Sequence, residues 1–254
     1  MITKIIVLIS AILSLSHFIS QSKSLQIPLE FSSGLPLIKV EIEGKFYSLI
    51  LDLGSPCEFA LRQDVLNNLK KERIDVHTIL GLDAQEITSS TYLLQRIRLH
   101  NGEIIHTLAQ EESRMLENHI SGIIGRNILQ TCNLILDFHH SVLVILKETQ
   151  DLQCGVPEIP FEMTRWGAVF SIETDFGIKR FSLNTSAPLS GIRSEKNGKI
   201  STSKFKIGAF DLGPTDLEVI DIHPNVNDID GYLGSDFFMK HVVRLDFQKG
   251  RASI

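Results

Sequence analysis

The sequence has few cysteines and no excess of basic residues. Only three cysteines occur in 254 residues, Cys57, Cys132 and Cys154. An odd number does not make a disulfide framework, so no bridge can be assigned, and no Cys/His spacing resembles a zinc site. Lys and Arg number 25 against 30 Asp and Glu, which gives a formal net charge of −5. Because the basic residues are also scattered, nucleic acid is excluded as an expected partner.

Long apolar runs are missing everywhere except at the start of the chain. Lys4 is followed by a mostly apolar stretch, residues 5–15, and then by a Ser-rich stretch to Ser24. This pattern is typical of a signal peptide and is too short for a comfortable membrane span. We therefore expect residues 1–24 to be a signal peptide and the protein to be exported, either secreted or periplasmic if bacterial, with no membrane contact afterwards. An uncleaved N-terminal anchor is the alternative, because no clear Ala-x-Ala cleavage site follows.

The rest of the chain has an ordinary globular composition, with 43% hydrophobic and 22% charged residues. It is long enough for one large domain or two small ones. Alternating apolar and polar residues between turn signals predict mainly strands, including a hairpin that turns at Asn101-Gly102. One short amphipathic helix is predicted between Arg62 and Lys71, where Val65, Leu66 and Leu69 recur at helical spacing.

One of the predicted strands ends in an acidic residue. Leu49 to Asp52 runs directly onto the turn Leu53-Gly54-Ser55-Pro56. An ionised carboxylate beside an apolar core is costly unless it is hydrogen-bonded or used in function. Asp is also a common turn residue, so this segment by itself is consistent with a plain turn or with a functional acid.

The chain makes this turn a second time. Leu183 to Pro188 matches Leu51 to Pro56 at an offset of 132 residues, which places Asn184 at the position of Asp52. Ile159 to Glu162 matches Ile27 to Glu30 at the same offset. Since the register is held across the intervening strands, we interpret the match as an internal duplication rather than chance.

A glycine segment also recurs. Gly122 and Gly125, three residues apart in an apolar run, are matched by Gly231 and Gly234 at an offset of 109 residues. Glycines at this spacing let neighbouring backbones approach closely. The second copy is thus shorter by 23 residues between its turn and its glycine segment.

The duplication predicts two similar β domains that pack as pseudo-symmetric halves. We expect an N-terminal lobe at residues 25–148, a linker at 149–158 and a C-terminal lobe at 159–254. Equivalent turns can meet at the axis of such a pair, so Asp52 and Asn184 should face one another.

Together these motifs resemble the pepsin and retropepsin group of aspartic peptidases. Each lobe of that family carries Asp-Thr-Gly-Ser/Thr on a turn after a hydrophobic strand, followed later by two hydrophobic residues and a glycine. The resemblance covers residues 26–254. It implies an all-β fold with a few short helices, in two pseudo-symmetric lobes of the acid-protease β-barrel type. It also implies a covering hairpin, which we expect within Ile74 to Leu94 and in the first lobe only.

The first turn matches the family pattern with one departure. The resemblance assigns Asp52 as the first catalytic aspartate, and Gly54 and Ser55 stand where the family has Gly and Ser/Thr. Leu53 replaces the family's Thr. Because that Thr hydroxyl hydrogen-bonds to the other lobe, we expect one cross-lobe contact to be missing.

The second turn departs further. Asn184 occupies the position of the second catalytic aspartate, while Thr185 is retained. Ser186 and Ala187 replace the Gly and the Ser/Thr. In the family two carboxylates share one proton and act on a trapped water. An amide neither takes nor gives a proton at ordinary pH, so the dyad is incomplete.

Three functions are compatible with these residues. The first is an exported peptidase homologue whose inter-lobe cleft binds an extended peptide or protein but is catalytically impaired. The second is an active aspartic endopeptidase. It would use Asp52 alone as a monomer, or it would form a homodimer in which Asp52 meets the Asp52 of the second copy. The third is a non-catalytic β interaction module. No cofactor or metal is implied, because the family's chemistry uses only water and carboxylates.

Overall fold

The computed structural model describes residues 24–146 and 156–254, except residues 33, 81, 82, 84, 100, 101, 113 and 115. Residues 1–23 of the predicted signal peptide, Cys154, Asn101 of the predicted hairpin turn and most of the predicted linker lie outside this range. No helix in the described ranges has the length and apolar character needed to cross a membrane. We refer to residues 24–146 as the first half and to residues 156–254 as the second half.

The first half is built on one large β-sheet. Its eight strands lie in the order β2-β3-β4-β9-β5-β8-β7-β6. The strands are β2 (Glu30–Ser32), β3 (Leu35–Ile42), β4 (Lys45–Asp52), β5 (Phe59–Leu61), β6 (Lys71–Leu80), β7 (Glu86–Leu99), β8 (Gly102–Glu111) and β9 (Gly122–Gly125), and the helices are α2 (Gln63–Asn67) and α3 (Arg126–Leu129).

Helix α2 is shorter than the sequence predicts. The prediction covers Arg62 to Lys71, but the helix ends at Asn67 and Lys71 already pairs with Leu94 at the start of β6. Leu69 lies beyond the end of the helix but is still buried in the core. The apolar spacing therefore marks the buried residues correctly but overestimates the length of the helix.

The second half repeats this plan with shorter strands. Its main sheet has the order β17-β20-β16-β21-β15-β14-β18-β19, with β13 pairing β14. The elements are β13 (Glu162–Thr164), β14 (Gly167–Thr174), β15 (Gly177–Leu183), β16 (Gly191–Arg193), β17 (Lys199–Thr202), β18 (Phe205–Ile207), β19 (Phe210–Asp211), β20 (Thr215–Ile220), β21 (Gly231–Leu233) and α4 (Ser235–Phe238).

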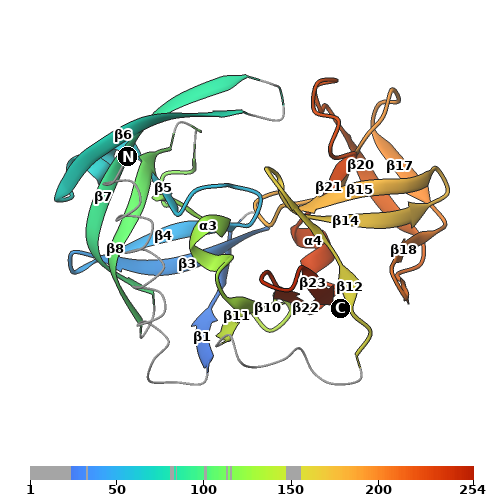
Figure 1. Cartoon of the computed structure of the whole chain (residues 1–254), viewed down its shortest axis with the longest axis horizontal. Helices are drawn as coiled ribbons and strands as arrows, with labels where there is room; N and C mark the ends of the chain where they lie inside the picture. Colours follow the sequence, from blue (N-terminus) through green and yellow to red (C-terminus); the bar gives the residue numbers. More distant parts are fainter. Residues whose placement is uncertain are drawn as a thin grey trace.

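A third sheet joins the two halves beneath them (Figure 1). Its order is β1-β11-β10-β22-β23-β12. Strand β10 of the first half pairs antiparallel with β22 of the second, and this brings Leu134 opposite Leu245, both fully buried. The strands are β1 (Ser24–Pro28), β10 (Asn133–Asp137), β11 (Val142–Leu146), β12 (Ile159–Pro160), β22 (Val243–Asp246) and β23 (Arg251–Ser253). The two halves therefore share one sheet.

The difference in length between the halves falls in one place. In the second half only residues 194–198 separate β16 from β17, whereas in the first half α2 and the long strand β6 follow β5. As a result the first half carries a long β6–β7 hairpin, which extends toward the second half (Figure 1).

The repeated glycines lie where two backbones touch. A Cβ atom on Gly122 would clash with the carbonyl oxygen of Ala60, and one on Gly231 would clash with that of Gly191. Gly125 and Gly234 are pressed in the same way against the backbone of Cys57 and of Leu189. Larger residues at these four positions would separate β9 and β21 from the segments that follow the two turns.

Candidate functional site

The two repeated turns meet between the halves. Asp52 is the last residue of β4, which runs parallel to β9, and Asn184 directly follows β15, which runs parallel to β21. A methyl group placed on Gly54 would lie 3.1 Å from Oδ1 of Asp52 and 3.2 Å from Cγ of Asn184. The structure thus brings the two side chains together across Gly54.

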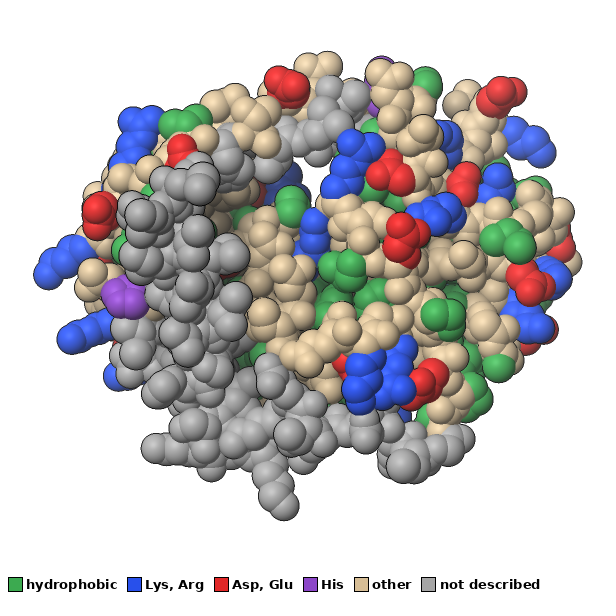
Figure 2. All heavy atoms as spheres, in the orientation of Figure 1, with side chains coloured by type: hydrophobic (Ala, Val, Ile, Leu, Met, Phe, Trp, Pro, Cys, Tyr) green, Lys and Arg blue, Asp and Glu red, His purple; other side chains and the backbone are tan. Residues whose placement is uncertain are grey.

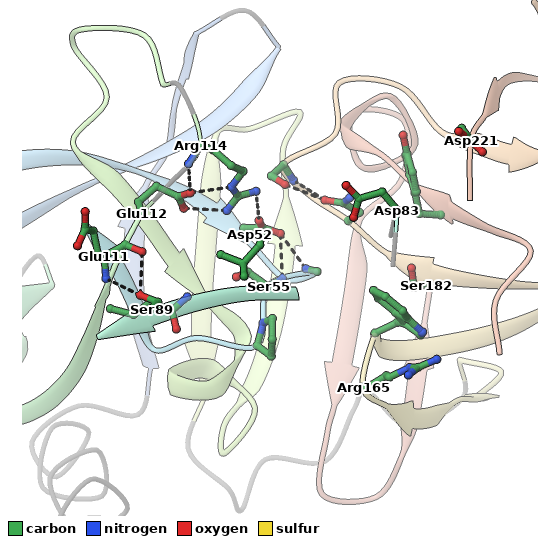
Figure 3. Close-up of a pocket in the computed structure, with 18 residues that line it drawn as sticks. Asp52, Ser55, Asp83, Ser89, Glu111, Glu112, Arg114, Arg165, Ser182 and Asp221 are labelled. Carbon is green, nitrogen blue, oxygen red and sulfur yellow. Dashed lines mark hydrogen bonds and ion pairs between the residues drawn. The ribbon is translucent and has the colours of Figure 1, made fainter. Parts of the chain in front are cut away.

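The carboxylate of Asp52 is buried, with only 3% of the residue exposed, and it is fully engaged. Its Oδ1 accepts hydrogen bonds from the backbone N–H groups of Gly54 at 2.9 Å and Ser55 at 3.1 Å. Its Oδ2 accepts a longer hydrogen bond from Nη1 of Arg114 at 3.4 Å (Figure 3). This is a charge-assisted contact on the carboxylate oxygen that the turn leaves open.

Arg114 is held in place by a second carboxylate. Its Nε and Nη2 atoms donate to the two oxygens of Glu112, each at 3.0 Å. Burial by itself would lower the pKa of Arg114, but the hydrogen-bonded Glu112 and the charge on Asp52 raise it above its usual value. Arg114 therefore stays cationic beside Asp52. No sequence motif marks Arg114 or Glu112, because the contact with Asp52 spans 62 residues of chain.

Asn184 is engaged with its own turn. Its Oδ1 accepts hydrogen bonds from the backbone N–H of Ser186 at 3.2 Å and from the Ser186 hydroxyl at 2.8 Å. The residue that replaces the family glycine thus orients the amide. The oxygen bound in this way cannot serve as a general base, and the amide nitrogen is not a proton donor for catalysis.

Thr185 connects the two turns. Its hydroxyl, which is completely buried, donates to the carbonyl oxygen of Leu51 at 2.6 Å and accepts from the backbone N–H of Leu53 at 3.0 Å. The mirror-image pair of contacts would need a hydroxyl at position 53. Leu53 has no hydroxyl, so Thr185 contacts the first turn but no equivalent side-chain contact is made from position 53 to the second turn. The sequence predicts this missing contact from the replacement of Thr by Leu53.

A buried arginine supports the first turn from the other side. Arg126, at the start of α3, donates to the carbonyl oxygens of Gly54 at 2.6 Å and Arg165 at 2.5 Å, which ties the turn to the second half. Burial lowers the pKa of Arg126, and the negative charge of Asp52 partly opposes this. Burial also raises the pKa of the nearby Cys57 thiol to about 12. Cys57 is therefore a protonated core residue and not a nucleophile.

A cavity of about 450 Å³ opens above the two turns. The space-filling view shows the molecule hollowed between its halves at this place (Figure 2). The β6–β7 hairpin contributes Asp83, Ile87 and Ser89 to the lining, and all three lie within the range where the sequence predicts the covering hairpin. Other lining residues come from both halves and include Asp52, Arg114, Ser182, Asn184, Asp221 and Tyr232.

Three acids of the second half, Asp175, Asp228 and Asp230, do not line this cavity, so none of the three takes the place of Asn184. Asp175 accepts hydrogen bonds from Ser203, and Asp228 forms a two-point ion pair with Arg165. Asp230 accepts from the backbone N–H of Arg180. These acids fasten loops and strands of the second half. Among the described residues, no three His, Cys, Asp or Glu side chains gather as metal ligands would.

Two solved structures show what this arrangement is similar to. The aspartic proteinase from Irpex lacteus superposes with a TM-score of 0.65 at 13% sequence identity, over 90% of this chain and 96% of that chain. The Basic 7S globulin from soybean superposes with a TM-score of 0.59 at 11% identity, over 91% of this chain and 94% of that chain. No protein-family model matches the sequence, and no curated protein matches it significantly. The predicted fold class is confirmed: the chain has a mostly β, pepsin-like fold with a few short helices.

Proposed function

We propose that this protein is an exported homologue of aspartic peptidases that binds an extended peptide between its halves and does not hydrolyse it efficiently. The observation that carries the proposal is the environment of Asp52. Where the chemistry needs a second carboxylate, Asp52 meets the amide of Asn184, and its Oδ2 is bound by Arg114. Export rests on the pattern of residues 1–24 alone.

The reaction fails at the proton transfers. A working dyad shares one proton, so that one carboxylate can take a proton from water while the other donates to the substrate carbonyl. Here Asp52 has no carboxylate partner on the second turn, and both oxygens of the nearby Glu112 are bound by Arg114. Loss of one acid–base participant costs roughly 10²- to 10⁴-fold in rate. The Arg114 contact adds to this by competing for the oxygen that would face water.

Peptide binding is supported by the cavity and by its cover. The cavity lies at the meeting of the two halves, which is a common place for ligand sites. Its lining combines apolar side chains such as Ile87 and Trp166 with polar side chains from both turns. A plain β interaction module would not require a hairpin that reaches across such a cavity.

A homodimer that pairs two copies of Asp52 is disfavoured by the geometry. The second half already packs against the first turn, through the buried hydroxyl of Thr185 and the guanidinium of Arg126. A second copy of the first half would have to displace it and break the shared sheet. We therefore propose a monomer.

A blocked-cleft experiment tests the proposal. Ile87 and Thr88 are neighbours on β7, but only Ile87 lines the cavity, whereas Thr88 is exposed. Each is replaced by Cys in a protein that also carries Cys154→Ser and is labelled with a bulky maleimide. Cys57 and Cys132 are buried and should not react.

Binding of a fluorescent pool of uncharged octapeptides is then measured by anisotropy. We expect the label at position 87 to lower affinity by about tenfold or more, or ~1.4 kcal/mol, and the label at position 88 to leave it unchanged. Equal binding by both labelled proteins, or no binding by the unlabelled protein, would refute a peptide-binding cleft.

A further inference from the structure

The two halves differ at one pair of core positions beside the turns. In the first half Ile50 and Ile123 pack in a buried apolar cluster, together with Leu37 and Ala60. The offsets of 132 and 109 residues place Ser182 and Tyr232 at the corresponding positions of the second half. Ser182 and Tyr232 instead line the cavity. The second half therefore has polar groups where the first half is closed by apolar side chains.

These polar groups have unused hydrogen-bonding capacity. Ser182 is only 5% exposed, and within the described residues neither its hydroxyl nor that of Tyr232 makes a hydrogen bond. The Ser182 hydroxyl is not enclosed in the core but opens onto the cavity, where a polar group of a ligand can reach it. Since its apolar counterpart Ile50 shows that the fold does not need a hydroxyl there, Ser182 is best explained by a polar group that enters the cavity.

The charges around this part of the cavity are negative. Asp83, from the hairpin tip, and Asp221, which follows β20, both line it, and neither forms an ion pair with a described residue. Figure 3 shows both on the side of the cleft away from Arg114 and Glu112, with Ser182 below them. An entering cation would meet two unneutralised carboxylates.

The cations of the cavity are already neutralised. Arg165 is bound by both oxygens of Asp228 and lies over the ring of Trp166, 5.1 Å from its centroid. Arg114 is bound by Glu112 and Asp52. Neither leaves a net positive charge to attract an acidic ligand, whereas unpaired carboxylates at a cleft attract positive charge.

We propose that the second-half side of the cleft binds a lysine or arginine side chain of the peptide. Its ammonium or guanidinium group would approach Asp221 and Asp83, and its methylene stem would lie along Trp166 and Tyr232, with Ser182 as a further acceptor. This inference rests on the proposed function, because it names which peptides the cleft selects.

Four peptide pools test the inference. Each pool consists of capped octapeptides with one central position fixed as Lys, Arg, Leu or Glu, and the other positions are mixtures of uncharged residues. We expect the Lys and Arg pools to bind about two- to fivefold tighter than the Leu pool, the range for a partly exposed ion pair, and the Glu pool to bind weakest. The advantage should shrink as salt is raised from about 50 mM to about 500 mM.

Substitutions identify the residues responsible. Asp221→Asn and Asp83→Asn should each reduce the preference for Lys over Leu. Ser182→Ile, which copies the first half, should reduce it as well. Glu195→Gln is the matched control, because Glu195 is exposed and does not line the cavity but its loss changes the net charge equally. Circular dichroism establishes that each variant is folded.

The outcomes separate this inference from the proposed function. Equal binding of all four pools, a preference for Leu or Glu, or an unchanged preference in Asp221→Asn and Asp83→Asn would overturn the inference while peptide binding stands. If no pool binds, the proposed function fails, and the inference fails with it.

Discussion

Thr185 is the residue on which the contact between the two turns depends. Its hydroxyl satisfies a backbone acceptor, Leu51, and a backbone donor, Leu53, from the other half. In a symmetric pair of turns a second hydroxyl would share this role. Because Leu53 has no hydroxyl, no second contact of this kind can compensate for the loss of Thr185.

Replacement of Thr185 by Val should therefore destabilise the whole molecule. Valine fills the same volume but leaves two buried backbone groups without this partner, at a cost of about 1–3 kcal/mol. Urea unfolding measures the free energy of unfolding. Thr78→Val, the same change at an exposed strand position, is the control and should stay within about 0.5 kcal/mol of the parent. An equal effect of the two substitutions would rule out the role assigned to Thr185.

The sequence predicts some of the site residues and misses others for a clear reason. Asp52, Asn184 and Thr185 are recognised because they stand in short repeated turns. Arg114 and Ser182 are not, because what matters about them is which residues they face across the fold. Alignment of the two repeats would have marked Ser182, because it is a polar residue at the position where the first half has the buried Ile50.

At the scale of elements, one side chain fastens the segment after the first turn to strand β8. Glu58, just before β5, accepts hydrogen bonds from the Thr107 hydroxyl at 2.6 Å and the Leu108 backbone N–H at 2.7 Å. Burial raises the pKa of Glu58, and these two hydrogen bonds oppose the rise only in part. Its protonated form therefore favours the folded state.

This predicts a pH-dependent contribution to stability. Since the pKa of Glu58 is higher in the folded than in the unfolded state, its contribution is complete below the ordinary value of 4.5 and is lost as the pH rises through the raised pKa. Glu58→Gln is neutral at every pH. We expect the stability of this variant relative to the parent to increase from about pH 4 to about pH 7 in urea unfolding. The exposed control Glu72→Gln should show no such trend, and a flat difference for Glu58→Gln would argue against the raised pKa.

Most elements of the first half follow from local patterns, whereas several of the second half do not. Strands β7 and β8 form the antiparallel hairpin that the sequence predicts around Asn101-Gly102. The short strands β17 to β19 have two to four residues each, too few for a period to be recognised. Strand β17 pairs with β20, β18 pairs with β14 and β19 pairs with β18. No local pattern contains these pairings.

At the scale of the whole molecule, the halves depend on each other. The repeat predicts two similar lobes, but it does not predict that they share the sheet in which β10 pairs with β22. That sheet holds the two turns at a fixed distance, so that Asp52 and Asn184 meet without any second chain. The same arrangement leaves the cavity above them and places the β6–β7 hairpin beside it.

A proteolysis assay with the intact protein tests most directly the proposal that the site of Asp52 and Asn184 does not hydrolyse peptides efficiently. A reduced and denatured protein is incubated with the parent and with Asp52→Asn from about pH 3 to about pH 7, a range that includes the upper titration of a carboxylate dyad. Fragments are identified by mass spectrometry. An Asn184→Asp/Arg114→Gln variant, which restores the second carboxylate and releases Oδ2 of Asp52, serves as the comparison and should cleave faster than the parent. We expect the parent and Asp52→Asn to be equally inactive. Fragments that the parent produces and Asp52→Asn does not would contradict the proposal that the dyad is incomplete.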